Sequence, residues 1–366
     1  MNICIPFERG AHRRALPLFL EIEAKKRGWT VNAIDGPHRH QEEIGEAVKN
    51  CDVLVTTSPW WDYINMWVHA AKHYGKPWIY HPEGWDNCHP VIVPGEEAHA
   101  KNLGWPYKPD AICAHGTAMG RVLIERQDID PNTIVYTGSP RFDIYGEYYD
   151  EIVKPIGLPF DPDGWEHIIL VCTATLWNHD EIISKLTPLH GTKVVVRQHF
   201  TDPVDLYKHH DCTVVLPESI DVNSPERDHN YNPDITDLIA YARQLYHADV
   251  VVNVAGTSSL EAMMLEVPVI NINELPKDAP PKEHAKIFGH YGPGAHYADV
   301  RAGESSLVGS VDDLPDMVEH AFDNDPNYKH TEAVLNDILS IHMNNHRPSC
   351  TAMSSIMSVI ENTGNK

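Results

Sequence analysis

The residues with the clearest chemical potential lie in one stretch, "VNVAGTSSLEAMMLEVPVINI" at positions 252–272. Its first apolar run stops at Gly256, and three hydroxyl residues follow it: Thr257, Ser258 and Ser259. Small and hydroxyl residues at the start of a helix suit an anion, because unbonded N–H groups and the positive end of the helix dipole lie there. Glu261, one helical turn later, can accept hydrogen bonds from the vicinal hydroxyls of a sugar. The stretch therefore predicts a diphosphate cradle beside a sugar-binding carboxylate.

A second interpretation of this stretch needs no ligand. Ser and Thr are common helix N-caps, and a Glu three residues after the cap completes a capping box. Thr257 or Ser258 as the cap, with Glu261 as its partner, fits that pattern. The motif alone leaves both interpretations open.

Near the N-terminus, "PFERGAHRR" (6–14) also gathers titratable groups. Glu8 and His12 can exchange protons, and Gly10 permits close approach of a ligand to the backbone. Arg9 and Arg13 add a local basic patch that suits an acceptor bearing phosphate or carboxylate. A solvated helix start is the alternative for this segment.

The segment "HPEGWDNCH" (81–89) places titratable groups around a Gly and a Trp. Glu83 and Asp86 are candidates for a general base, while His81 and Trp85 suit binding and stacking of a sugar acceptor. A structural turn would account for the same residues. The Trp pair of "SPWWDY" (58–63) is typical of core packing and could also line the same site.

These side chains need elements to position them, and the chain alternates short apolar runs with amphipathic segments. The expected strands are 2–6, 30–34, 52–56, 77–81, 110–114, 133–137, 167–172, 193–197, 213–216, 249–254 and 267–272. The expected helices are 12–27, 41–50, 62–74, 117–127, 180–186, 234–246, 258–265, 311–322 and 331–343, with another near 351–361. This order predicts an α/β fold with parallel sheets covered on both faces.

Three Pro and two Gly in "EYYDEIVKPIGLPFDPDGWEH" (147–167) interrupt the alternation and mark a domain boundary. We expect an N-terminal acceptor domain over 1–150, a C-terminal donor domain over 151–330, and C-terminal helices over 331–366 that pack back on the first domain. Both domains should be doubly wound and Rossmann-like and should face a cleft. The Gly- and Pro-rich segment 277–304 is expected to be a long loop.

In such a fold the candidate residues of the second domain lie at strand–helix turns. Strand 249–254 ends just before the hydroxyl residues, which places them at the carboxyl edge of a parallel sheet, where ligands bind. "CTATLWNHDE" (172–181) forms the first strand–helix turn of the same domain. Thr173, Thr175 and Asn178 are candidate phosphate contacts there, with helix capping as an equal alternative for Asn178.

The stretch "ADVVVNVAGTSSLEAMMLEVPVINI" resembles the nucleotide-sugar-binding segment of GT-B-fold glycosyltransferases. The resemblance implies that the hydroxyls of Thr257, Ser258 and Ser259 face the donor diphosphate. It also implies that Glu261 binds the ribose of the nucleotide. One departure is Glu266, which stands where the family usually has Gly, and it affects the geometry of the turn.

Further segments follow in the order of that family. "VYTGSPRFDIY" (135–145) resembles an element of the CDP-glycerol glycerophosphotransferases of teichoic-acid synthesis, and "ICAHGTAMGRVLIE" (112–125) resembles the strand and helix before it. "VVVRQHF" (194–200) implies that Arg197 and His199 meet the donor phosphates. The resemblance covers most of the chain in element order and is specific at 135–143 and 249–272.

We therefore expect a glycosyltransferase that moves a sugar from a nucleotide-diphosphate donor to a hydroxyl acceptor of unidentified type. The nucleotide-sugar is a co-substrate, and we expect no cofactor and no metal, because no DxD dyad stands at a suitable place. Phosphate-binding residues would stabilise the leaving diphosphate instead. Three alternatives stay open: a CDP-polyol phosphotransferase, a sugar-nucleotide 2-epimerase, and a non-catalytic nucleotide-sugar-binding protein.

Composition narrows the class of protein. The net charge is −23, and residues 1–150 carry 15 Lys and Arg against 20 Asp and Glu, so most of the excess lies in the second half. Such a balance repels polyanions and argues against nucleic acid as a general partner. Seven scattered Cys, the absence of an 18-residue apolar run and a charged N-terminal segment favour a cytoplasmic protein. Among the 24 His, no spacing is typical of a metal site, and "HH" (209–210) is interpreted as a pair of solvated loop residues.

Overall fold

The structure is a computed structural model of the 366-residue chain. It describes residues 1–7, 15–35, 39–57, 62–82, 108–127, 129–173, 179–199, 202–203, 205–217, 233–254, 256–274, 307–323, 328–344, 346–349 and 351–365. The chain forms two compact units. Unit 1 comprises Met1–Asp143, Asn336–Ile341 and Cys350–Lys366, and unit 2 comprises Ile144–Leu335 and His342–Ser349.

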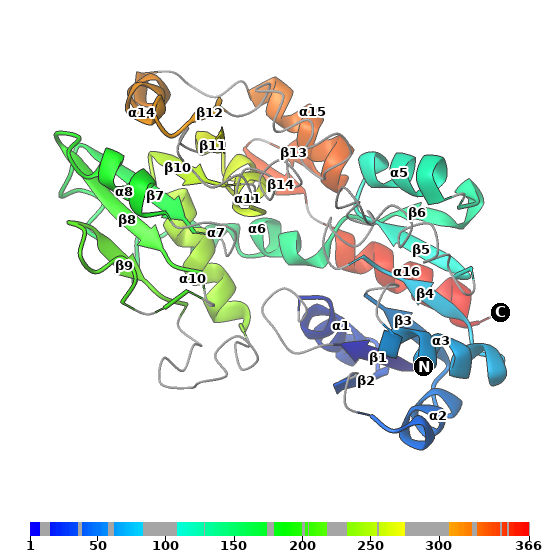
Figure 1. The fold of residues 1–366 in the computed structure, drawn as a ribbon. Coiled ribbons are helices and arrows are strands. Elements are labelled where there is room, and N and C mark those ends of the chain that lie inside the picture. The colour runs from blue at the N-terminus through cyan, green and yellow to red at the C-terminus, as the bar shows by residue number, and fades with distance from the viewer. Residues whose placement is uncertain are drawn as a thin grey trace. The chain divides into compact units, whose positions relative to one another are not determined.

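Unit 1 is built on a six-stranded parallel sheet with strand order β2-β1-β3-β4-β5-β6 (Figure 1). Its strands are β1 (Asn2–Phe7), β2 (Thr30–Asp35), β3 (Val53–Thr56), β4 (Trp78–Tyr80), β5 (Ala111–Ala114) and β6 (Ile134–Tyr136). The inner strands β3, β4 and β5 are buried along their whole length. Parallel strands covered on both faces consist of nearly continuous apolar residues, which is why the sequence pattern located them.

Helices cover both faces of this sheet. They are α1 (Ala15–Lys26), α2 (Gln41–Lys49), α3 (Asp62–His73), α5 (Thr117–Gln127) and α16 (Ala352–Gly364), with 3-10 turns η2 (Pro131–Thr133) and η3 (Pro140–Phe142). Right-handed crossovers put α1 on one face and α2 and α3 on the other. In agreement, α2 contacts α3, whereas α1 contacts α16. The last helix of the chain thus completes the layer on the α1 face.

Unit 2 is built on a second six-stranded parallel sheet, with strand order β12-β11-β10-β7-β8-β9 (Figure 1). Its strands are β7 (His167–Cys172), β8 (Thr192–Arg197), β9 (Thr213–Val215), β10 (Val250–Asn253), β11 (Val269–Glu274) and β12 (Leu307–Ser310). The order reverses between β7 and β10, as it does in a dinucleotide-binding Rossmann sheet.

The helices of unit 2 also form two layers. They are α6 (Asp143–Glu147), α7 (Tyr149–Ile152), α8 (Asp180–Leu186), α10 (Ile235–Tyr246), α11 (Ser258–Met264), α14 (Leu314–Asp323) and α15 (Tyr328–Leu339), of which α6 begins and α15 ends in unit 1. α14 contacts α8, and α10 contacts α11. The apolar core between the sheet and the α8–α14 layer includes Ile169, Val252, Ile183 and Val318, all fully buried.

The α/β fold class predicted from the sequence is confirmed, but the sequence missed three strands. β12 was not predicted, and neither was the antiparallel hairpin of β13 (His342–Asn344) and β14 (Arg347–Ser349). The helix expected to run to residue 343 ends at Leu339 instead, because Ser340 adopts a left-handed φ of 55° that no helix continues through. The loop predicted at 277–304 lies outside the described residues.

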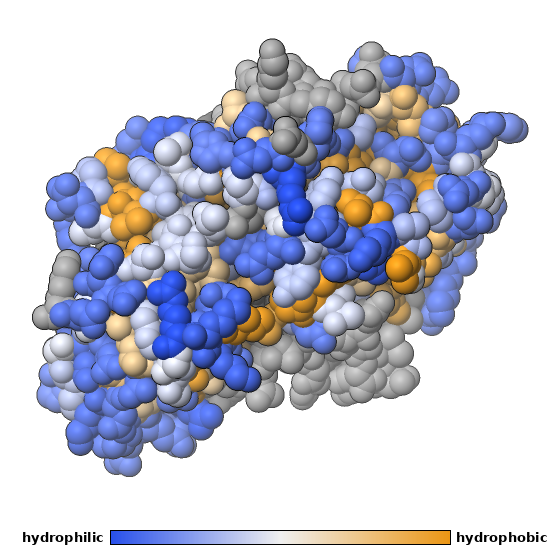
Figure 2. Space-filling view, turned by 180° about the vertical axis from the view of Figure 1, so that it is seen from behind, coloured by the Kyte–Doolittle hydropathy of each residue, from blue (hydrophilic) through white to orange (hydrophobic). Residues whose placement is uncertain are grey.

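Large apolar side chains on the surface are dispersed. Figure 2 shows one face that is mostly hydrophilic, with small separate apolar patches. Among the described residues, Ile156 and Trp165 are the most exposed large apolar side chains, at 65% and 47%. No helix in the described part of the chain is both long and apolar enough to cross a membrane.

Candidate functional site

The predicted donor residues lie at the point where the strand order of unit 2 reverses. β7 ends at Cys172 and β10 ends at Asn253, and these two strands are neighbours in register, with Asn253 opposite Cys172. On the other side of β7, Arg197 ends β8 opposite Cys172. Ligands bind at such a switch point, because the turns after the two strands leave in opposite directions and open a crevice.

Three side chains meet around Tyr241 of α10 at this edge. The Tyr241 hydroxyl donates to Oγ of Ser258 at 2.7 Å and lies 3.8 Å from Sγ of Cys172. The Arg197 guanidinium stacks over the Tyr241 ring at 5.4 Å from its centroid and donates to the Leu216 carbonyl at 3.1 Å. Arg197 and Ser258 were predicted from the sequence, whereas Tyr241 and Cys172 were not.

Glu261 belongs to the same cluster. Glu261 is 2% exposed. Its carboxylate lies close enough to raise the pKa values of two neighbouring acidic groups, the Cys172 thiol and the Tyr241 hydroxyl. Burial is the main cause that raises the pKa of Cys172 to about 11, and the Glu261 carboxylate acts in the same direction. Hydrogen bonds with Tyr241 and Ser258 and the charge of Arg197 act in the opposite direction. Burial also raises the pKa of Tyr241 well above its usual value, with Cys172 and Glu261 acting in the same direction. Both groups therefore stay protonated at neutral pH, and Tyr241 remains a hydrogen-bond donor.

The helix cap expected in the second interpretation is not formed. The N-cap of α11 is Thr257, and its side chain makes no capping hydrogen bond. A capping box would then need an acid at position 260, which is Leu260. The Ser258 and Ser259 hydroxyls of this turn instead form hydrogen bonds with other side chains.

The Ser259 hydroxyl is engaged inside the protein. It accepts from Nδ2 of Asn253 at 2.8 Å and donates to Oδ1 of Asn271 at 2.7 Å, and so joins β10, α11 and β11. Nδ2 of Asn253 also donates to the Gly256 carbonyl at 3.0 Å. A Cβ at Gly256 would stand only 2.7 Å from Oδ1 of Asn253, so this network requires glycine there.

His199 and Thr173 form a second chain of bonds at the same edge. The His199 N–H donates to Oγ1 of Thr173 at 2.7 Å, and that hydroxyl donates to Oδ2 of buried Asp202 at 2.7 Å. Burial lowers the pKa of His199 to about 4, so its imidazole is neutral at neutral pH. Thr175 and Asn178 lie outside the described residues.

In unit 1 the described residues include one predicted site residue, His81, which directly follows β4. It is 1% exposed, and its ring centroid lies 5.3 Å from that of His115. Burial lowers the pKa of His81 well below its usual value, and His115 acts in the same direction. The other predicted site residues of unit 1 lie outside the described residues: Glu8, Arg9, Gly10, His12, Arg13, Glu83, Trp85 and Asp86.

The motif "TGSPRFD" (137–143) attaches the last helix to unit 1. The Asp143 carboxylate accepts from the backbone N–H groups of Ala352 at 3.0 Å and of Met353 at 2.7 Å, at the start of α16. Thr351, the N-cap of α16, makes no side-chain cap of its own. Asp143 therefore caps α16 from a segment about two hundred residues earlier, which is a structural use of this motif.

The departure at Glu266 also has a structural consequence. Its backbone adopts a left-handed φ of 60°, the conformation that the glycine usual at this position takes without strain. The Glu266 carboxylate lies 2.6 Å from Nδ1 of His346, whose own φ is 65°. This side-chain contact joins two residues held in the left-handed region.

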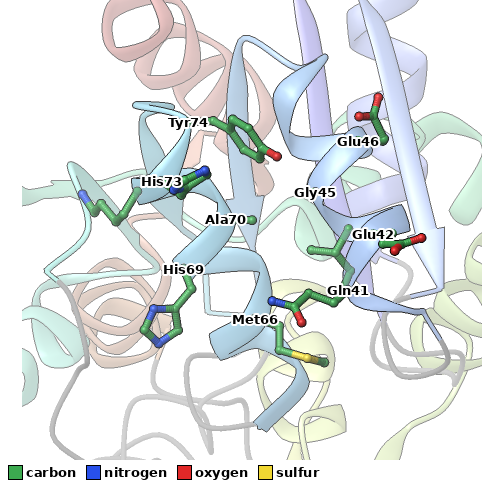
Figure 3. A pocket seen from close by; sticks show the side chains of 11 residues that line it. Gln41, Glu42, Gly45, Glu46, Met66, His69, Ala70, His73 and Tyr74 are labelled. Carbon is green, nitrogen blue, oxygen red and sulfur yellow. The ribbon is translucent and has the colours of Figure 1, made fainter.

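A hollow of about 1160 Å³ opens between α2 and α3 of unit 1 (Figure 3). Glu42 and Glu46 line it from α2, His69 and His73 line it from α3, and Tyr74 lines it just after the end of α3. None of its lining residues belongs to the predicted donor or acceptor sets.

Solved structures with the same fold were found, whereas no protein-family model and no curated protein matches the chain. HepE of Anabaena, solved with UDP and glucose, is 12% identical, with a TM-score of 0.57 and 100% of both chains covered. The UDP-GlcNAc 2-epimerase of Neisseria meningitidis, bound to UDP-GlcNAc, is 13% identical, with a TM-score of 0.55 and coverage of 99% of this chain and 100% of that one.

The wall teichoic acid polymerase TagF is similar in the same way. It is 13% identical, with a TM-score of 0.59 over 100% of this chain and 89% of TagF. At such identities the likeness concerns the fold alone. The chain has a GT-B-like fold with two six-stranded parallel sheets, as the sequence resemblance implied.

Proposed function

We propose that this protein is a glycosyltransferase that holds a nucleoside-diphosphate sugar at the carboxyl edge of the unit 2 sheet. The observation that carries the proposal is the cluster of Arg197, Tyr241, Ser258 and Glu261 at the switch point between β7 and β10. It combines one cation, two hydroxyls and one carboxylate where a nucleotide would lie. HepE with UDP and glucose, and the epimerase with UDP-GlcNAc, support a ligand of this class.

Each group has a distinct task in the proposed donor site. The Arg197 guanidinium offers several N–H donors to the diphosphate and stabilises the charge that develops as the sugar departs. The Ser258 hydroxyl accepts from Tyr241, so its own proton can be donated to a phosphate oxygen. Glu261 accepts hydrogen bonds from the ribose hydroxyls. Backbone groups at Gly256 and Thr257 and the neutral imidazole of His199 complete the set.

The acceptor is proposed to bind to loops of unit 1. His81 follows β4, and "PFERGAHRR" starts with the last two residues of β1, so both begin at the carboxyl edge of that sheet. Among the residues after these strands, Glu83, Asp86, Glu8 or His12 would accept the proton of the acceptor hydroxyl, and Arg9, Gly10, Arg13, His81 and Trp85 would bind the acceptor. The sugar then passes from the donor phosphate oxygen to the acceptor oxygen, and a nucleoside diphosphate leaves. No step requires a metal.

Transfer of a polyol phosphate is the second candidate. The resemblance at 135–145 and the likeness to the wall teichoic acid polymerase TagF favour it. The two reactions break different bonds. Glycosyl transfer cleaves the bond between the sugar carbon and oxygen and releases a nucleoside diphosphate. Polyol-phosphate transfer cleaves the P–O–P bridge and releases a nucleoside monophosphate.

Calorimetric titration of the whole chain with UDP, GDP, CDP and ADP tests the donor site. We expect one diphosphate to bind, and Glu261→Gln to bind it about 10- to 100-fold more weakly, because a hydrogen bond to a charged group is lost. Glu319→Gln, an exposed residue of α14, is the control. Absence of binding to all four, or equal binding by E261Q, would contradict the proposal.

Once the base is known, the product identifies the reaction. The corresponding sugar or polyol donor is incubated with a panel of hydroxyl acceptors, and the released nucleotide is separated by ion-exchange chromatography. Release of the diphosphate supports glycosyl transfer, and release of the monophosphate supports polyol-phosphate transfer. Binding without acceptor-dependent release of either would point to a binding protein.

A further inference from the structure

One cluster of metal-ligating side chains in unit 2 takes no part in the proposed donor site. It consists of Asp180, the first residue of α8, and of His209 and His210, which lie between β8 and β9. Each residue offers one ligand atom, and the three atoms all lie within 4.8 Å of one another. The fold creates this group, because almost thirty residues separate the Asp from the His pair.

The distances in this cluster match those around a metal ion. Nε2 of His210 lies 3.0 Å and Nε2 of His209 lies 3.4 Å from the same Oδ1 of Asp180. Ligands held at the usual zinc bond lengths in a tetrahedron are separated by about 3.4 Å. A cation between the three atoms would therefore require only small movements of the side chains.

The two imidazoles are arranged side by side rather than spread apart. Their ring centroids are 4.0 Å apart and the planes are inclined by 39°. Both Nε2 atoms approach the same carboxylate oxygen, so both rings converge on one point. Such convergence is what a shared metal ion needs, and a solvated pair of His residues does not require it.

The chemistry of the ligands selects the class of cation. Two imidazoles and one carboxylate suit Zn2+ and the neighbouring divalent transition metals, whereas Mg2+ and Ca2+ prefer oxygen ligands. Access is available, since the His209 side chain is 59% exposed while that of His210 is 10% exposed. The strong excess of negative charge in the second half of the chain also favours a cation.

We propose that Asp180, His209 and His210 form a binding site for a divalent transition metal of the Zn2+ class. Three protein ligands leave further positions to water. The bound ion connects the start of α8 to the segment that leads into β9, and so joins two consecutive crossovers of the unit 2 sheet. Because it binds the folded chain, it raises the thermal stability of unit 2.

The test is calorimetric titration of the full-length chain with ZnCl2 after treatment with a chelator. We expect one saturable equivalent per chain, and Mg2+ should not compete for it. Asp180→Asn, His209→Gln and His210→Gln should each weaken Zn2+ binding more than about tenfold, since loss of a direct ligand costs at least as much as loss of its outer-shell support. His190→Gln, at an exposed position outside the cluster, is the matched control and should bind as the wild type does.

A second measurement locates the ion without relying on affinity. Co2+ held by these ligands should give visible absorption bands that H209Q removes and H190Q keeps, and Zn2+ should raise the melting temperature of the wild type and of H190Q only. H209Q alters an exposed side chain, so it should fold. Absence of saturable Zn2+ binding would overturn the proposal. Equal binding by the wild type and the three ligand variants would overturn it as well.

Discussion

At the residue scale, two adjacent hydroxyls of α11 have different surroundings. Oγ of Ser259 lies between Asn253 and Asn271 in a buried network, whereas Ser258 is half-buried and accepts from Tyr241 beside Arg197. The sequence pattern predicts the same role for both, because "TSS" at a strand–helix turn carries no sign of which hydroxyl turns inward. Alanine variants of Ser258 and Ser259 should therefore affect different quantities, nucleotide binding in the first case and the stability of the fold in the second.

Ser259→Ala should lower the free energy of unfolding by about 1–3 kcal/mol, because it deletes both hydrogen bonds of a buried hydroxyl. Its affinity for the nucleoside diphosphate should change little. Ser258→Ala should show the reverse, with weaker binding and a smaller loss of stability. Urea unfolding and calorimetric titration measure the two quantities. Equal nucleotide affinities for the two variants would contradict this division of roles.

The buried imidazoles of unit 1 give stability a dependence on pH. His115 donates from Nε2 to the Pro82 carbonyl at 2.7 Å, yet burial lowers its pKa from 6.5 to about 4. The unfolded chain thus binds this proton more readily than the folded chain does. The contribution of neutral His115 is fully present above pH 6.5 and is lost as the pH falls from there through about 4.

His115→Gln removes this titration while keeping a donor for the Pro82 carbonyl. Between pH 7 and pH 4.5 we expect its free energy of unfolding to fall less steeply than that of the wild type, as measured by urea denaturation at several pH values. The exposed control His190→Gln should follow the wild-type slope. Parallel slopes for the wild type and H115Q would contradict the assignment.

At the element scale, the sequence predicted the central strands of both sheets but missed the edge strand β12 and the end of α15. The strands that later lie in the middle of each sheet, such as β7 and β10, are apolar along their length, so their signal does not depend on neighbours. β12 is a short edge strand in "LVGS" that pairs only with β11, and its four residues carry no periodic pattern. α15 ends at a left-handed Ser340 in a place with no Gly or Pro to announce the stop.

For the candidate site too, the sequence predicted the residues that have a local signal and missed those that only packing brings together. Arg197, Ser258 and Glu261 stand at strand ends or helix starts, so a motif and a fold class were enough to select them. Tyr241 lies in the second turn of an ordinary amphipathic helix, and only the packing of α10 on α11 brings it to the site. The cluster of Asp180 with His209 and His210 was missed for the same reason. Contacts between distant segments leave no local pattern.

Packing between elements also explains the Gly of "HGT" (115–117). A Cβ at Gly116 would stand 2.3–2.5 Å from backbone atoms of Asp337 and Ile338 at the end of α15, and backbone cannot yield as a flexible side chain does. Gly116→Ala should therefore lower the free energy of unfolding by about 1–3 kcal/mol. Gly45 in α2 is the matched control, because its Cβ would meet the Tyr74 side chain at ordinary contact distances, with the hydroxyl at 3.4 Å.

Gly45→Ala should raise stability by about 0.5–1 kcal/mol, since Ala loses less backbone entropy in a helix. If urea unfolding shows that G116A lowers the free energy of unfolding and G45A raises it, the result supports close approach of α15 to the start of α5. A neutral effect of G116A would show that the two segments can separate without cost.

At the scale of the whole molecule, both halves share an architecture but place their switch points differently. In unit 1 the order reverses between β1 and β3, and in unit 2 between β7 and β10. In unit 2 the turns at the reversal carry residues that the sequence singled out, such as Thr173 and Ser258. The negative charge concentrated in the second half disfavours extended polyanions as ligands of unit 2.

The units are not continuous in sequence, because unit 1 includes the last helix of the chain. α16 contacts α1, β3 and β5, and Asp143 caps its first turn. Seven of its residues are buried: Ala352, Met353, Ile356, Met357, Val359, Ile360 and Thr363. Each large apolar side chain among them contributes about 1.5–3 kcal/mol on burial. Their sum is comparable to the whole stability of an ordinary domain, about 5–15 kcal/mol.

A chain ending at residue 350 should therefore lose the fold of unit 1 although residues 1–143 are intact. Hydrogen exchange followed by mass spectrometry should show fast exchange of the amides of β1 and β3, while those of β7 and β10 stay protected by the core of unit 2. Asp143→Asn should produce a milder form of the change, with faster exchange confined to the first turns of α16, and exposed Asp316→Asn should produce none. Continued protection of β1 and β3 in the shortened chain would mean that the first 143 residues fold without their distant last helix.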